Sequence, residues 1–213
     1  MTPHRPELKE TEKETGRLEA FSDGVFAVAI TLLVLDIKTP KAVDLAAANT
    51  GLTDALLAQW PSYLSYVLSF ITVLIMWTNH HRMFRYIRRV DNTFLLLNGV
   101  LLLFITLAPF PTSLLAEYIM RPEARTATMV YSGAFICIGV AFNLMWIYAS
   151  HRGRLLARNY DRAVVKHLTR GYLMGPVVYI AALGLAIFSV AASVGLCYLL
   201  TFYFGLPAKR ENG

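Results

Sequence analysis

Charge and cysteine are scarce in this sequence. Only 16% of its 213 residues are charged and 56% are hydrophobic, whereas soluble domains have about a quarter charged and about half apolar residues. Its two cysteines, Cys137 and Cys197, lie inside apolar runs, where a buried thiol is more common than a disulfide or a metal ligand. These shortages argue against an ordinary soluble domain and a disulfide-rich scaffold, and they favour an integral membrane protein.

Motifs that mark enzymes are also missing. The sequence contains no glycine-rich phosphate loop, metalloprotease helix, serine nucleophile elbow or Cys-x-x-Cys pair. His80 and His81 are adjacent, so their side chains diverge by about 100° on a helix and are poorly placed to share one metal ion. We therefore expect no enzyme activity, no metal and no cofactor. The net charge of +6 comes from basic clusters between apolar runs, which suits membrane topology better than nucleic-acid binding.

The apolar runs predict an all-α integral membrane protein with six transmembrane helices. A helix needs about 20 residues to cross a hydrocarbon core of about 30 Å. Residues 171–207 carry no charge, and this run is too long for one span and long enough for two short ones. We expect a cytosolic tail over 1–16, a six-helix membrane domain over 17–207 and a second cytosolic tail over 208–213. The six helices are expected at about 18–37, 61–84, 93–115, 127–149, 171–189 and 191–206.

Two local features refine this arrangement. Pro109 and Pro111 lie late in the third helix and predict a kink or a break there, because proline removes a backbone donor and clashes with the preceding turn. The basic block 151–170 spaces its charges at about one helical turn and indicates an interfacial helix.

The distribution of Lys and Arg predicts the orientation, because these residues concentrate on the cytoplasmic side of membranes. With the amino terminus inside, sixteen of the 20 Lys and Arg fall in cytosolic segments, and only Lys38, Lys41, Arg121 and Arg125 fall outside. The bias predicts a multi-pass protein of the plasma membrane with both termini in the cytoplasm.

Polar residues at the cytosolic ends of the first three helices are expected to meet. An ionisable side chain such as Asp23 is costly in a span unless it faces protein or water. Histidines end the second helix and an asparagine begins the third, all at a depth similar to that of Asp23. We interpret them as a structural polar network, and a proton-relay role for Asp23 stays open as the alternative. The predicted network consists of Arg17, Ser22, Asp23, His80, His81 and Asn98.

The opposite side of the first helix is almost wholly apolar. At 3.6 residues per turn, Val28, Thr31, Leu32 and Leu35 share one arc and Asp23 lies roughly opposite. Judged from the residues alone, such a stripe is more often a lipid-facing or helix-packing surface than a site.

The same helix resembles the start of the transmembrane protein 175 family of potassium channels, in its single-repeat prokaryotic form. The string Arg-x-x-x-Phe-Ser-Asp at 17–23, followed by Gly-Val-Phe-Ala-Val-Ala-Ile-Thr-Leu-Leu-Val-Leu-Asp, carries the resemblance. Trp77 with His80-His81-Arg82-Met83-Phe84 is similar to the end of the family's second helix. Asp91 with Leu95-Leu96-Leu97-Asn98 is similar to the start of its third. After about residue 125 the similarity rests mainly on hydropathy.

This resemblance implies a potassium-permeable cation channel built from four identical chains in a lipid bilayer, with potassium and other monovalent cations as its permeant ions. In that family the first helix lines the pore, and the positions that match its constriction are Val28, Thr31, Leu32 and Leu35. Val28 departs from the Ile or Leu that the family more often has. Rings of Leu32 and Leu35 would form an apolar neck, and we expect Thr31 to supply the polar selectivity layer.

Other functions remain open at this stage. The nearest is a proton-coupled secondary transporter that uses Asp23 as its titrating carboxylate. An integral-membrane enzyme and an assembly subunit without activity of its own are further alternatives.

Overall fold

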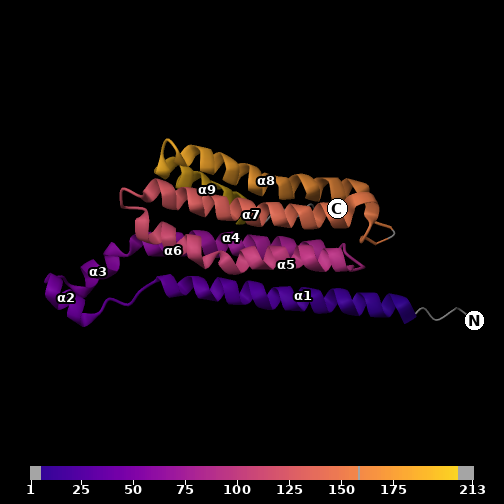
Figure 1. Cartoon of the computed structure of the whole chain (residues 1–213), viewed down its shortest axis with the longest axis horizontal. Helices are drawn as coiled ribbons and strands as arrows, with labels where there is room; N and C mark the ends of the chain where they lie inside the picture. Colours follow the sequence, from indigo (N-terminus) through magenta and orange to yellow (C-terminus); the bar gives the residue numbers. More distant parts are fainter. Residues whose placement is uncertain (1–5, 158, 206–213) are drawn as a thin grey trace, which may run out of the picture.

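Long helices that run side by side make up the part of the chain that the structure describes, residues 6–157 and 159–205 (Figure 1). The structure is a computed structural model of the single chain. Figure 1 places α1 along one edge, α4 and α5 next to it, and α7, α8 and α9 on the far side. The elements in chain order are α1 (Pro6–Leu32), η1 (Leu33–Asp36), α2 (Ala42–Ala48), α3 (Leu52–Ala58), α4 (Trp60–Phe84), α5 (Asn92–Leu107), α6 (Pro109–Tyr118), α7 (Ala124–Ser150), η2 (His151–Gly153), α8 (Arg162–Ala186) and α9 (Val190–Gly205).

Five helical segments of the described chain are long and apolar enough to cross a membrane. α9 is apolar too, but its 16 residues reach only about 24 Å at 1.5 Å per residue. The all-α membrane fold is therefore confirmed, while a sixth span stays a prediction. The five segments are Glu14–Asp36, Trp60–Phe84, Asn92–Tyr118, Ala124–Gly153 and Arg162–Ala186.

Two helices start earlier than the sequence predicted. α1 begins at Pro6, inside the segment expected to be a tail, since proline is well suited to a first helical turn. α8 begins at Arg162 rather than at 171, because the Asp161 carboxylate accepts a hydrogen bond from the Ala163 amide at 2.7 Å and caps the helix. The later part of the basic block is thus the first turns of α8 and not a separate interfacial helix. The tail predicted over 208–213 lies outside the described residues.

The predicted break in the third span is confirmed. α5 ends at Leu107 and α6 begins at Pro109, so the segment Asn92–Tyr118 is two helices in one span. Asp91 caps the other end of α5, because its carboxylate accepts from the Phe94 amide at 2.9 Å and from the Tyr148 hydroxyl at 2.8 Å. These two ends fix the position of α5 beside α1 and α7.

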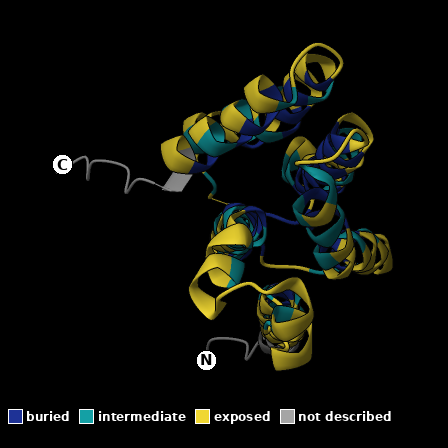
Figure 2. Cartoon of the chain, turned by 90° about the vertical axis from the view of Figure 1, so that its left-hand side faces the viewer, coloured by how far each residue is buried: buried dark blue, intermediate teal, exposed yellow. Residues whose placement is uncertain are grey.

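Small polar residues hold the centre of the bundle together. The Thr112 hydroxyl of α6 donates to Ser69 of α4 at 2.7 Å, and Ser69 lies 3.2 Å from the Tyr131 hydroxyl of α7. In a membrane, helices associate through small residues and such hydrogen bonds, since lipid is as apolar as leucine. Figure 2 shows that buried residues gather on the sides where helices face one another. α4 is thereby a central helix, and α1 packs mainly against α4, α5 and η1 at the edge of the bundle.

Candidate pore-lining face and its polar anchor

One side of α1 packs against the bundle. Ser22, Phe26, Ala29 and Leu33 are each at most 1% exposed, and their spacing of three to four residues follows one face of the helix. We call these four residues the buried stripe. It contacts α4 and α5, which fixes the rotation of α1 about its own axis.

The other side of α1 is open in the single chain. Val28 is 55% exposed, Leu32 41% and Leu35 70%, and Thr31 is exposed as well. We call these four residues the exposed stripe. They are the residues that the sequence grouped on one arc, and the structure places them on the side of α1 that the bundle leaves uncovered.

The end of the exposed stripe is not an ordinary α-helix. α1 gives way at Leu33 to the 3₁₀ turn η1, which ends at Asp36 before the extended backbone of Ile37. In a 3₁₀ turn residues three apart eclipse one another and the rise per residue is larger. Leu35 therefore follows Leu32 on the same side of the helix axis. The sequence prediction of a uniform helix over 18–37 did not contain this turn.

The hydroxyl of Thr31 has a defined direction. It donates a hydrogen bond to the Val28 carbonyl, three residues earlier, at 2.8 Å. A hydroxyl that has given its hydrogen to the backbone keeps its lone pairs as acceptors. The exposed stripe thus presents one oxygen acceptor between apolar side chains.

Three of the six residues predicted for the polar network form one chain of hydrogen bonds across three helices. The Asn98 amide of α5 donates to the Ser22 hydroxyl of α1 at 3.0 Å, and the Asn98 carbonyl oxygen lies 3.0 Å from Nε2 of His80 on α4. Because that oxygen only accepts, Nε2 of His80 carries the hydrogen. Ser22 passes its own hydrogen to the Leu18 carbonyl at 2.9 Å. All three side chains are buried.

The His80 ring is enclosed on its remaining sides by aromatic residues. Its centroid lies 5.4 Å from that of Phe26 and 4.6 Å from that of Phe84. Its Nδ1 atom has no hydrogen-bond partner among the described residues. The ring thus joins the buried stripe to α4 by packing as well as by hydrogen bonding.

Asp23 has a different partner from those expected. The sequence suggested a histidine, an amide, Ser22 or Arg17 as its donor, but the indole Nε1 of Trp77 donates to its carboxylate at 2.8 Å. Arg17 is exposed and makes no ion pair with Asp23 in the described part of the chain. Trp77 lies one helical turn before His80 and His81 on α4, and this spacing could have identified it as a donor on the same face.

His81 also pairs outside the predicted network. Its Nδ1 lies 2.8 Å from the Glu19 carboxylate of α1, and its ring stacks on that of Trp77 with centroids 6.0 Å apart. Glu19 is one turn before Asp23, and the predicted network did not include it. α1 and α4 are therefore joined by two successive polar contacts in addition to the hydrogen-bond chain through Asn98.

Comparison with known proteins bears on this arrangement. Residues 17–109 match the family model described as the endosomal/lysosomal potassium channel TMEM175. A potassium channel of Chamaesiphon minutus is 49% identical over 93% of this chain and 97% of its own length. The chain belongs to the TMEM175 family. A potassium channel of Streptomyces collinus is 42% identical over 90% of this chain and 92% of its own length.

A solved TMEM175 structure has the same fold. The crystal structure of a lysosomal potassium-selective channel TMEM175 homolog from Chamaesiphon minutus aligns with a TM-score of 0.83 at 47% identity, covering 94% of this chain and all of that one. The matched TMEM175 segment, 17–109, contains the exposed stripe, the buried stripe and the polar contacts that join α1 to α4 and α5. The resemblance seen in the sequence is therefore confirmed, and the protein is a multi-pass membrane protein of a channel family.

Proposed function

We propose that the protein is a potassium-permeable cation channel in which four copies of α1 surround a central pore. The observation that carries the proposal is the exposed stripe itself: an apolar surface that the chain leaves open, on a helix whose opposite side is tied down by buried hydrogen bonds. The names of its bacterial relatives support potassium as the permeant ion. Closed symmetric assembly is the usual way for identical chains to enclose an axis.

Apolar rings account for gating in this proposal. Leu32 and Leu35 follow one another along the axis, so four copies form two stacked rings of leucine. A narrow apolar constriction resists wetting and stops ions until it widens. Val28 is smaller than the Ile or Leu that resemblance to the family leads one to expect, and we expect its ring to be the wider one.

Thr31 supplies the polar layer of the pore. Its hydroxyl hydrogen is given to the Val28 carbonyl, so its oxygen faces the axis as an acceptor for a cation. Four such oxygens replace part of the hydration shell of a monovalent ion. The channel lies in the plasma membrane with both termini in the cytoplasm, because in this orientation sixteen of the 20 Lys and Arg lie on the cytoplasmic side.

Potassium flux into proteoliposomes tests the proposal, using Leu35→Ala with Leu96→Ala as its matched control. Leu96 of α5 is 72% exposed and Leu35 70%, so the two variants remove the same atoms from equally open positions on different helices. We expect Leu35→Ala to lower the apolar barrier and raise flux about tenfold, which corresponds to about 1.4 kcal/mol. Leu96→Ala should leave flux unchanged.

Two outcomes contradict the proposal. Equal flux in wild type, Leu35→Ala and Leu96→Ala shows that α1 does not line the path. Uptake that depends on a pH gradient, without potassium flux down its own gradient, indicates the proton-coupled transporter that uses Asp23.

A further inference from the structure

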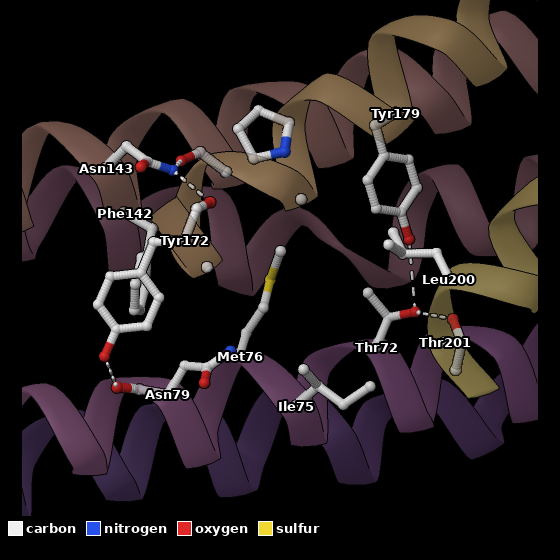
Figure 3. A pocket seen from close by; sticks show the side chains of 14 residues that line it. Thr72, Ile75, Met76, Asn79, Phe142, Asn143, Tyr172, Tyr179, Leu200 and Thr201 are labelled. Carbon is white, nitrogen blue, oxygen red and sulfur yellow. Dashed lines mark hydrogen bonds between the residues drawn. The ribbon is translucent and has the colours of Figure 1, made fainter. Parts of the chain in front are cut away.

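A cavity of about 70 Å³ lies inside the subunit, away from α1. Its walls come from α4, α7, α8 and α9, and Figure 3 shows α4 along one side and α8 along the other, with Leu200 and Thr201 of α9 at one end. By the same measure of volume a single water needs only about 10–15 Å³. The cavity therefore holds a group several times the size of a water molecule.

Beside the cavity α8 carries Pro176 and two glycines, Gly171 and Gly175. Pro176 has no amide hydrogen, which leaves the Tyr172 carbonyl without its helical partner. Nδ2 of Asn143 on α7 replaces that partner, donating to the Tyr172 carbonyl at 2.9 Å. Gly171 and Gly175 place no side chain in the space, and a Cβ at either would meet no atom within 4 Å. The structure thus keeps the space open while it satisfies the backbone.

The deep end of the cavity offers no free hydrogen-bond donor. The Thr72 hydroxyl donates to the Leu68 carbonyl at 2.8 Å and the Thr201 hydroxyl to the Cys197 carbonyl at 2.9 Å. The Tyr179 hydroxyl lies 3.4 Å from Thr72, which is left as its acceptor (Figure 3). These hydroxyl hydrogens are all used in hydrogen bonds within the protein, and Ile75, Met76 and Leu200 also line the cavity. The deep end therefore suits a hydrocarbon better than a polar solute.

The other end of the cavity is polar and open. Gly171 is exposed there, and the side-chain amide of Asn79 is half-buried and makes no hydrogen bond within the described chain. Arg82 lies about one helical turn after Asn79 on α4, and Arg170 directly precedes Gly171 on α8. Both arginines are exposed, and neither pairs with an acidic residue of the described chain.

The depth of the cavity matches the cytosolic leaflet. Asn79 lies about 28 Å along α4 from Trp60, and Thr72 about 18 Å, at 1.5 Å per residue. With Trp60 at the outer interface, Asn79 and Arg82 lie at the inner boundary of a hydrocarbon core about 30 Å thick. The cavity thus runs from the cytosolic interface into the core, in the orientation proposed above.

We propose that this cavity binds a segment of one acyl chain of an anionic phospholipid from the cytosolic leaflet, with its head group held by Arg82, Arg170 and the Asn79 amide. The charge of the two arginines selects an anionic lipid, since each basic side chain near the surface contributes about 1 kcal/mol of attraction. The apolar walls and the absence of free donors at the deep end select a hydrocarbon chain. The site is independent of the pore and of the permeant ion.

Native mass spectrometry of the purified protein with added phosphatidylglycerol or phosphatidylcholine tests the site. Gly175→Leu fills the cavity without displacing backbone, and Gly184→Leu is its control, because Gly184 is on the same helix, exposed, equally free of neighbours and outside the cavity. We expect Gly175→Leu to abolish the most tightly held phosphatidylglycerol and Gly184→Leu to retain it.

The head-group contacts are tested separately with the double variant Arg82→Gln and Arg170→Gln. We expect phosphatidylglycerol to bind about thirtyfold more weakly after the loss of both charges. The control is Arg125→Gln, an exposed arginine at the opposite end of the bundle. Equal retention of phosphatidylglycerol by wild type and Gly175→Leu, or equal retention of phosphatidylcholine and phosphatidylglycerol by wild type, overturns the proposal.

Discussion

The two stripes of α1 differ in what surrounds them and in how readily the sequence explains them. The buried stripe and its polar neighbours contact α4 and α5 through hydrogen bonds that leave one orientation for the helix. The exposed stripe has only one oxygen and otherwise methyl and methylene groups. The polar residues of α1, although unusual in a membrane helix, stabilise its position. The apolar residues on its opposite side form the candidate site.

The largest effect is expected at Asn98, which joins the buried stripe of α1 to His80 of α4. Replacing Asn98 with Leu removes the acceptor of Nε2 of His80 and the donor to the Ser22 hydroxyl in a buried space, at a cost of about 3 kcal/mol or more in free energy of unfolding. Thermal unfolding in detergent measures it. Thr106→Leu is the control on the same helix, because Thr106 is exposed and its hydroxyl donates to the Leu103 carbonyl of the same helix. Equal unfolding temperatures for the two variants would contradict the anchoring role.

Trp77→Phe should have an intermediate effect. It removes the indole hydrogen bond to the Asp23 carboxylate while keeping an aromatic ring, at a cost of about 1.5 kcal/mol, because bonds to charged acceptors are stronger than neutral ones. Trp60→Phe, at an exposed tryptophan of the same helix, is the matched control. If both substitutions lower the unfolding temperature by the same amount, Trp77 contributes only its ring.

The sequence brought together the polar residues of three helices but did not give the partner of Asp23. Depth alone brought Ser22, His80 and Asn98 together, because hydropathy fixes where each residue lies along its span. Trp77 was missed because an indole at a helix end is usually counted as an interfacial aromatic residue. The hydrogen bond from Asn143 to the Tyr172 carbonyl, which lacks a helical partner because of Pro176, could not be predicted. It depends on how α7 and α8 are rotated against each other.

Some helix boundaries could be predicted from the sequence and others could not. The proline break between α5 and α6 follows from local chemistry and was predicted. The start of α8 was placed at the end of the charged residues, although the cap at Asp161 begins the helix nine residues earlier. The turn η1 follows from no residue type in Leu33–Asp36, and only the structure shows it.

Glu19→Gln should have a small effect on stability. The Glu19 contact with His81 is partly exposed, with 26% and 43% of the two side chains accessible, and such pairs contribute about 0.2–1 kcal/mol. The unfolding temperatures of wild type and variant should differ slightly at low salt and become equal at high salt. A loss as large as that of Asn98→Leu would show that this pair, and not the hydrogen-bond chain, anchors α1.

Thr31→Val should have the smallest effect on stability and a clear effect on function. The substitution keeps shape and removes the exposed oxygen, so the unfolding temperature should not change, while the preference for potassium over sodium should fall. Reversal potentials with potassium on one side and sodium on the other measure that preference. Unchanged selectivity would place the selectivity layer elsewhere.

Cysteine modification tests most directly whether the exposed stripe lines the ion path. Leu35→Cys and Leu96→Cys are made in a chain whose native Cys137 and Cys197 are replaced by alanine, and potassium current is recorded while a positively charged methanethiosulfonate reagent is added. Because the two leucines are equally open in the single chain, only their places in the assembly distinguish them. The account predicts that the reagent blocks current through Leu35→Cys and leaves current through Leu96→Cys intact. Current through Leu35→Cys that persists after complete modification of the cysteine would contradict it.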